Sequence, residues 1–154
     1  MEKEMLVLSR LSEKFSSLDT SKAAVSLRRI FLHVPSGIFM DVLRFAQEAL
    51  DFYHLCTITG LDTGTEYEFI YHISNHDGIV LNLKLFAPRE DSVIASILPI
   101  YPGATFYELE LQGLLGVKVE GLPEGRQYPL PDNWPKDQHP LRKDWVPDTA
   151  VKER

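Results

Sequence analysis

Hydrophobic side chains recur at helical spacing in several parts of the chain. Apolar residues every three or four positions form one stripe of a helix, and this pattern predicts an amphipathic helix wherever it persists. Thr105 and Glu108 fit a capping box at the start of the last such stretch. We predict four helices on this basis, over residues 2–18, 36–50, 92–98 and 105–115.

Strict alternation of apolar and polar residues predicts strands elsewhere. It covers residues 54–61, 67–74 and 79–87, and Asp77-Gly78 supplies a tight hairpin turn between the last two. A further strand, or two with a bend between them, is predicted within residues 23–34. The predicted fold class is therefore α+β, with two layers: an antiparallel-rich sheet of about four strands and helices packed on one face.

The periodic pattern stops after Val117. Six of the ten prolines lie between positions 123 and 147, which favours an extended or polyproline II-like backbone. Both tryptophans, Trp134 and Trp145, lie there too, and such large side chains are typical of interfaces. We therefore divide the chain into an α+β domain, residues 1–117, and an extended partner-binding tail, residues 118–154. The alternative is that the tail folds back on its own domain.

Composition and charge restrict the classes of function. Hydrophobic residues make up 44% and charged residues 25%, as in a globular protein, and the net charge of −6 argues against nucleic acid as a partner. The single Cys56 cannot form an internal disulfide or the thiolate shell of a zinc site or iron–sulfur cluster. The apolar runs fall short of the roughly 20 residues of a spanning helix, and the start of the chain lacks a basic signal-peptide region. We expect a soluble, cytosolic chain that reaches a membrane only through partners.

Candidate catalytic residues do not form a known constellation. His72 and His76 have the spacing of metal ligands on a helix, but they lie at the predicted hairpin, where this spacing does not bring the two rings together. Glu108 and Glu110 are two positions apart on a predicted helix, so their side chains diverge by about 200°. We interpret this pair as capping and surface residues.

Three segments resemble a known family. His-Pro-Leu-Arg-Lys-Asp-Trp at 139–145, preceded by Leu-Pro-Asp-Asn-Trp at 130–134, closely resembles the C-terminal signature of the C-type subunit family of respiratory complex I, the NADH dehydrogenase 30 kDa subunit family. Residues 106–117 are similar to the family's Tyr-Glu-Arg-Glu helix, and residues 52–62 to its Leu-Thr-x-Val-Asp strand. The resemblance covers about residues 36–146. The helix departs from the family pattern at Leu109, where arginine is usual, and at Gly113, where aspartate is usual.

These departures and the short tail favour the branch of the family found in energy-converting [NiFe] hydrogenases and formate hydrogenlyase-type membrane complexes. The resemblance implies a cofactor-free, peripheral scaffold subunit at the cytoplasmic face of the cell membrane. Such a subunit docks on the hydrogenase-like large catalytic subunit, with the small iron–sulfur subunit as a further partner, and supports electron transfer coupled to ion translocation. Iron–sulfur clusters, and [NiFe] or NADH and flavin, would belong to the partner subunits.

The same resemblance and the aromatic tail place the predicted partner interface on the predicted helix 105–115 and the tail. An extended backbone would point Arg142 and Asp144 to one side and their neighbours to the other. Two other hypotheses stay open: a stand-alone small-molecule binding module with the tail as a lid, and a metal hydrolase that uses His72 and His76. The predicted interface residues are Tyr107, Glu108, Glu110, Trp134, His139, Pro140, Leu141, Arg142, Lys143, Asp144 and Trp145.

Overall fold

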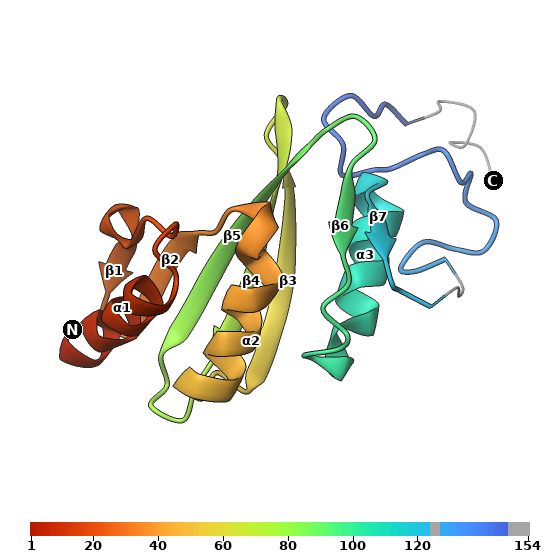
Figure 1. Ribbon diagram of the computed structural model, residues 1–154. Coiled ribbons are helices and arrows are strands. Elements are labelled where there is room, and N and C mark those ends of the chain that lie inside the picture. Colours follow the sequence, from red (N-terminus) through yellow and green to blue (C-terminus); the bar gives the residue numbers. More distant parts are fainter. Residues whose placement is uncertain (124–126, 148–154) are drawn as a thin grey trace.

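A five-stranded sheet forms the centre of the protein (Figure 1). The computed structural model describes residues 1–123 and 127–147. The strand order is β1-β2-β5-β4-β3, and neighbouring strands are antiparallel except β2 and β5, which are parallel. The strands are β1 (Ala24–Ser26), β2 (Arg29–His33), β3 (His54–Asp62), β4 (Glu66–Ser74) and β5 (Val80–Pro88).

Three α-helices and a second, smaller sheet complete the fold. The helices are α1 (Glu2–Lys14), α2 (Phe39–Leu50) and α3 (Thr105–Leu115), and short 3-10 helices cover Thr20–Lys22, Ser36–Ile38 and Pro102–Ala104. The second sheet pairs β6 (Val93–Ala95) in parallel with β7 (Lys118–Glu120). Figure 1 shows this small sheet beside α3, with the tail beyond it on the side away from the N-terminus.

The core lies on one face of the large sheet. Strand register places Ile58, Tyr71, Leu83 and Leu32 in one row across four strands, and each of these side chains is buried. The buried stripes of α1, α2 and α3 belong to the same hydrophobic cluster. A two-layer α+β fold with helices on one face is therefore confirmed, with five strands in the main sheet where about four were expected.

Helix α3 approaches the sheet closely because β3 carries a glycine beneath it. A Cβ atom on Gly60 would lie 2.6 Å from the side chains of both Leu111 and Leu115. The hydroxyl of Tyr67 on β4 donates to the carbonyl oxygen of Leu115 at 3.0 Å. The two segments that resemble the family's strand and helix, residues 52–62 and 106–117, are thus packed directly against each other.

Two local predictions were wrong. The helix expected over residues 92–98 is β6, in which buried Ile94 alternates with exposed Val93 and Ala95 and which pairs with β7. The capping box at Thr105 does not form, because α3 begins without a side-chain cap and Glu108 turns into the core. Two predicted helices are also shorter than expected: α1 ends at Lys14, and residues 36–38 form a 3-10 turn before α2.

The tail contains no helix or strand within residues 127–147, as its prolines led us to expect. Successive turns carry it along α3 to the loop between β3 and β4. Arg142 and Asp144 do contact each other, at 3.3 Å. A turn closed by the N–H of Trp145 on the carbonyl oxygen of Arg142 brings them together, in place of the extended backbone that we predicted. Strand β7 lies just beyond the predicted domain boundary at residue 117, and residues 124–126 and 148–154 lie outside the described residues.

Candidate partner interface

The tail, here meaning residues 127–147, first meets the domain at the exposed side of α3. The carbonyl oxygen of Tyr128 lies so close to Gly113 that a Cβ atom there would be 2.5 Å from it. The ring of Tyr128 packs on Phe106 with centroids 5.1 Å apart, and both rings are exposed. Glycine at position 113, where the family pattern has aspartate, is therefore the residue that lets the tail backbone pass.

The C-terminal end of α3 receives the second contact. His139 donates from Nδ1 to the carbonyl oxygen of Gly113 at 2.9 Å, and its ring lies against Gly116, whose φ of 76° ends the helix. The N–H of Leu141 donates to the carbonyl oxygen of Leu114 at 3.0 Å. The last carbonyl groups of a helix have no partner within the helix, so the tail satisfies two that would otherwise need water.

The two tryptophans form a small cluster around Gln138. Trp134 donates its indole N–H to the backbone carbonyl of Gln138 at 2.9 Å, and Trp145 donates to the side-chain oxygen of Gln138 at 3.4 Å. Their ring centroids are 6.0 Å apart, and both residues are half-buried. The tryptophans thus fix the conformation of the tail itself while part of each ring stays accessible.

A charged cluster fixes the end of the tail. Asp62, the last residue of β3, accepts the N–H of Lys143 at 2.8 Å, the N–H of Gly64 at 2.8 Å and the Nε–H of Arg89 at 3.2 Å, and Nη2 of Arg89 forms an ion pair with it at 2.9 Å. Burial alone would raise the pKa of Asp62, but these hydrogen bonds and the positive charge of Arg89 outweigh it, so the pKa lies below its usual value. The carboxylate is therefore charged at neutral pH.

Asp144 extends this cluster into the tail. Arg89 lies 2.7 Å from the carboxylate of Asp144, which also accepts from Arg142 at 3.3 Å. Desolvation opposes the charge of Asp144, but its hydrogen bonds and the two guanidinium groups lower its pKa. The ammonium of Lys143 donates to the carbonyl oxygen of Thr63 at 3.1 Å. Positive and negative groups alternate from β3 through the end of β5 to the tail.

The predicted interface residues fall into two groups. Seven lie together in the tail between positions 139 and 145, and Trp134 lies beside Trp145. The residues of α3 point elsewhere: Glu108 is fully buried, and the half-buried Tyr107 donates its hydroxyl to the carbonyl of Cys56 at 3.1 Å. The surface role that we expected for Glu108 is wrong, because its carboxylate accepts hydrogen bonds from Ser96 and from the N–H of Ile97. Glu110 is half-buried.

Five residues that the interface prediction missed contribute to this region. Asp62, Arg89 and Gly113 position the tail, and Phe106 and Tyr128 add exposed aromatic surface. Asp62 ends the strand that resembles the family pattern, so the sequence contained a signal for it. Arg89 had no such signal, because only the folded sheet brings it beside the tail.

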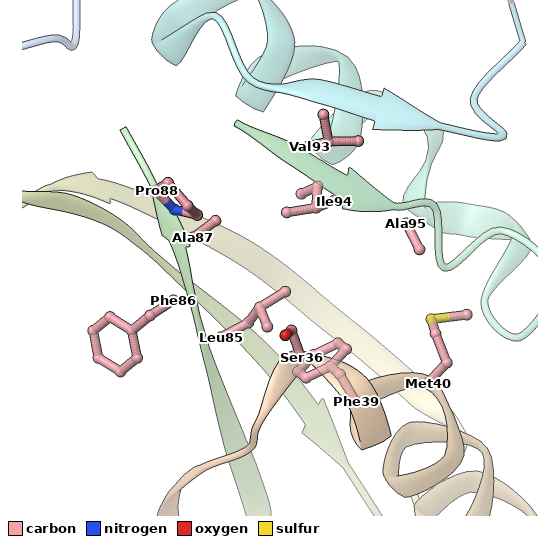
Figure 2. Close-up of a pocket in the computed structure, with 10 residues that line it drawn as sticks. All are labelled: Ser36, Phe39, Met40, Leu85, Phe86, Ala87, Pro88, Val93, Ile94 and Ala95. Carbon is pink, nitrogen blue, oxygen red and sulfur yellow. The ribbon is translucent and has the colours of Figure 1, made fainter. Parts of the chain in front are cut away.

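The two alternative hypotheses receive no specific support. A pocket between α2, β5 and β6 is lined by Ser36, Phe39 and Met40, by residues 85–88, and by β6 (Figure 2). None of residues 127–147 lines this pocket, whereas Arg142 and Asp144 line an open, polar pocket beside the β3–β4 loop. The metal-hydrolase hypothesis depends on His72 and His76, and the structure gives these two residues different contacts. His72 donates from Nδ1 to Asn82 at 2.6 Å and accepts from Thr59 at 3.0 Å, so both of its ring nitrogens are hydrogen-bonded, while His76 stacks on Tyr53.

In residues 1–123 and 127–147, no group of three or more His, Cys, Asp or Glu side chains is arranged to hold a metal ion. Within these same ranges, no helix is long and apolar enough to cross a bilayer.

Comparisons with known proteins agree with the motifs. Residues 32–151 match the family model of the respiratory-chain NADH dehydrogenase 30 kDa subunit. The C subunit of the F(420)H(2) dehydrogenase of Methanosarcina mazei is 32% identical over 142 residues, which cover 90% of this chain and 89% of the relative. The beta subunit of the membrane-bound hydrogenase of Pyrococcus furiosus is 26% identical, with 99% of this chain and 92% of the relative covered.

A solved structure supports the same conclusion. A chain of the membrane-bound sulfane sulfur reductase, an archaeal respiratory membrane complex, superposes with a TM-score of 0.84 at 26% identity, covering 97% of this chain and 89% of its own length. The family match begins near the end of β2 and covers β3, β4, β5, α3 and the tail signature. The chain therefore belongs to the family of the respiratory-chain NADH dehydrogenase 30 kDa subunit.

Proposed function

We propose that this chain is a peripheral scaffold subunit of a membrane-bound, multi-subunit oxidoreductase of the hydrogenase or complex I type. The named relatives are subunits of a dehydrogenase and of a membrane-bound hydrogenase, and the superposed structure is a respiratory membrane complex. Their match extends over nearly the whole chain, so the similarity includes the tail as well as the sheet.

In this proposal the chain holds no redox cofactor and acts by binding other subunits. It docks on the hydrogenase-like large catalytic subunit, with the small iron–sulfur subunit as a further partner. Iron–sulfur clusters, and [NiFe] or NADH and flavin, belong to those partners. The chain lies at the cytoplasmic face of the membrane and reaches the membrane only through the complex, where it supports electron transfer coupled to ion translocation.

The single observation that carries the proposal is an ordered tail with apolar side chains left in solvent. The backbone of residues 139–145 is fixed by hydrogen bonds to α3 and β3, yet Leu141 is 54% exposed and Val146 is 78% exposed. Phe106 in the first turn of α3 and Tyr128 at the start of the tail are also exposed and pack on each other. Exposed apolar and aromatic side chains on a fixed backbone are typical of a protein–protein interface.

Co-purification with the large subunit of the same complex tests this function. We expect the wild-type chain to be retained by a tagged large subunit, and Leu141→Asp to weaken retention because a charge is then buried without a partner. Leu27→Asp is the matched control, since Leu27 is 74% exposed in the β1–β2 turn, away from the tail. Both variants should melt like wild type. Failure of the wild-type chain to bind, or equal binding by both variants, would refute the proposed function.

A further inference from the structure

We propose that Asp62 is a positioning residue for the tail: it holds residues 142–145 in the conformation that the partner binds, so the partner meets a surface that is already folded in the free chain. This inference rests on the proposed function and adds to it the residue that sets the conformation of the interface. The alternative mode of binding is that of an extended peptide, in which the tail would take up its conformation only when it contacts the partner.

The two oxygens of Asp62 have separate tasks. Oδ1 accepts the N–H of Gly64 at 2.8 Å and so shapes the loop between β3 and β4. Oδ2 accepts the N–H of Lys143 at 2.8 Å and the Nε of Arg89 at 3.2 Å. The side chain is 1% exposed. One buried carboxylate thus ties the end of a core strand to a backbone group 81 positions later in the chain.

Arg89 makes this contact a bridge between the sheet and the tail. Its guanidinium lies 2.9 Å from Asp62 and 2.7 Å from Asp144. Opposite charges at these distances attract each other, and the pair with the buried Asp62 is screened least by solvent. The ion pair with Arg89 places the exposed carboxylate of Asp144 on the same side of the tail as Arg142, and Asp144 also contacts Arg142.

The position of this contact along the tail determines what it controls. The upstream contacts to α3, through His139 and Leu141, place the tail beside the helix. The contact between Asp62 and the N–H of Lys143 comes next and sets the direction in which the chain continues. Asp144 and Trp145, both in the predicted interface, come after this contact, so their positions depend on that direction.

Hydrogen exchange of the free, full-length chain tests the positioning. We expect Asp62→Ala to accelerate exchange at the amides of Lys143 and Trp145 by about tenfold or more, the effect of losing a hydrogen bond to a charged group. Amides of β4 and β5 should keep their wild-type rates. Asp77→Ala is the matched control, because Asp77 pairs with Lys3 on the surface and does not contact the tail. Unchanged exchange in the Asp62 variant overturns the inference.

A second pair of variants separates the tail from the β3–β4 loop, which Asp62 also shapes. Lys143→Pro deletes the N–H that Asp62 accepts, at the second position of the turn closed by Trp145, where proline is best tolerated. Lys143→Ala keeps that N–H and removes the side chain, together with the exposed hydrogen bond from its ammonium to the carbonyl oxygen of Thr63. The amide of Trp145 should exchange faster than wild type in the proline variant and at the wild-type rate in the alanine variant. Equal exchange rates at Trp145 in the two variants would contradict the positioning role.

Titration with the large subunit then connects positioning to assembly. Asp62→Ala and Lys143→Pro should each bind about tenfold more weakly than wild type, because only the fraction of chains with a positioned tail is competent to bind. Loosened tails that bind as tightly as wild type would overturn the inference while leaving the proposed function intact. Absence of binding by the wild-type chain would instead refute the proposed function itself.

Discussion

Replacing Glu108 should reveal how a buried carboxylate holds the segment between β6 and α3. The side chain is fully buried; its Oε1 accepts the N–H of Ile97 at 2.6 Å and its Oε2 accepts the hydroxyl of Ser96 at 2.7 Å. Ser96 in turn accepts the N–H of Leu98 at 3.2 Å. The carboxylate therefore organises three consecutive residues that connect the small sheet to the core.

The cost of Glu108→Ala follows from the groups that it leaves unpaired. The buried N–H of Ile97 loses its acceptor, which costs about 1–3 kcal/mol, while the hydroxyl of Ser96 can rotate and loses less. With the packing lost around the shortened side chain, we expect the free energy of unfolding to fall by about 3 kcal/mol. For a chain of this size that corresponds to a melting temperature about 6–12 °C lower. Glu108→Gln keeps an acceptor for Ile97 and should change the free energy of unfolding at pH 7 by about 1 kcal/mol or less.

The pH dependence of stability gives a sharper test. Burial raises the pKa of Glu108 above its usual 4.5, although the hydrogen bonds from Ile97 and Ser96 act in the opposite direction. At a pH between 4.5 and the folded pKa, the folded protein therefore holds a proton on this group that the unfolded chain has released. Between pH 4.5 and the folded pKa, the stability contributed by this residue falls as the pH rises. Glu108→Gln has no such titration.

Thermal and urea melts of wild type, Glu108→Gln and Glu108→Ala, measured between pH 4 and pH 7.5, check both points. The wild-type stability minus that of the glutamine variant should be greatest at the acid end and decrease as the pH rises. Glu110→Gln, two positions along the same helix, serves as the matched control and should follow wild type. A difference that grows with pH, or an alanine variant that melts like wild type, would show that the carboxylate does not hold this segment.

Three further predictions concern the tail and the small sheet. Gly113→Ala should displace the tail, because its Cβ atom would lie 2.5 Å from the backbone oxygen of Tyr128, and faster exchange of tail amides would report this. Acid should release the end of the tail, because the pKa values of Asp62 and Asp144 are lowered in the folded chain. The stability that these two carboxylates contribute is present above pH 3.8 and is lost as the pH falls through their folded pKa values. Both tryptophans of the chain lie in the tail, so their fluorescence should change in this range. A chain that ends after β7 should still melt cooperatively, whereas one that ends before β7 should melt at a lower temperature, because β6 then loses its partner strand.

The sequence predicted those elements whose residues specify them locally. Helix α2 and the three long strands were predicted from their periodic patterns, and most of the buried residues of α2, β4 and β5 lie on one face of each. Strand β6 was missed because three residues are too few for alternation to be distinguished from a helical turn. Its conformation depends on β7, which lies 25 positions further along the chain. Non-local pairing of this kind cannot be inferred from a local pattern.

The same limit explains what was missed at the candidate interface. The tail residues were identified from their likeness to a family signature, but the partners that fix them are distant in sequence: Asp62 is 81 positions from Lys143. Glu108 was assigned to the surface because a glutamate on a short helix is usually solvated. Its actual environment depends on the N–H of Ile97, whose direction is set by the turn after β6.

The three segments that carry the family resemblance contact one another in the fold. Strand β3 lies beneath α3 at Gly60, the end of α3 binds His139, and the end of β3 binds the backbone of Lys143. A substitution in any of them can therefore weaken assembly in two ways, by removing a contact to the partner or by moving the tail. Assembly measurements alone do not separate these causes. Hydrogen exchange of the tail amides in the free chain separates them. Substitution of Leu141, whose exposed side chain contacts only the partner in this proposal, should leave these exchange rates unchanged, whereas substitution of the buried Asp62 should raise them.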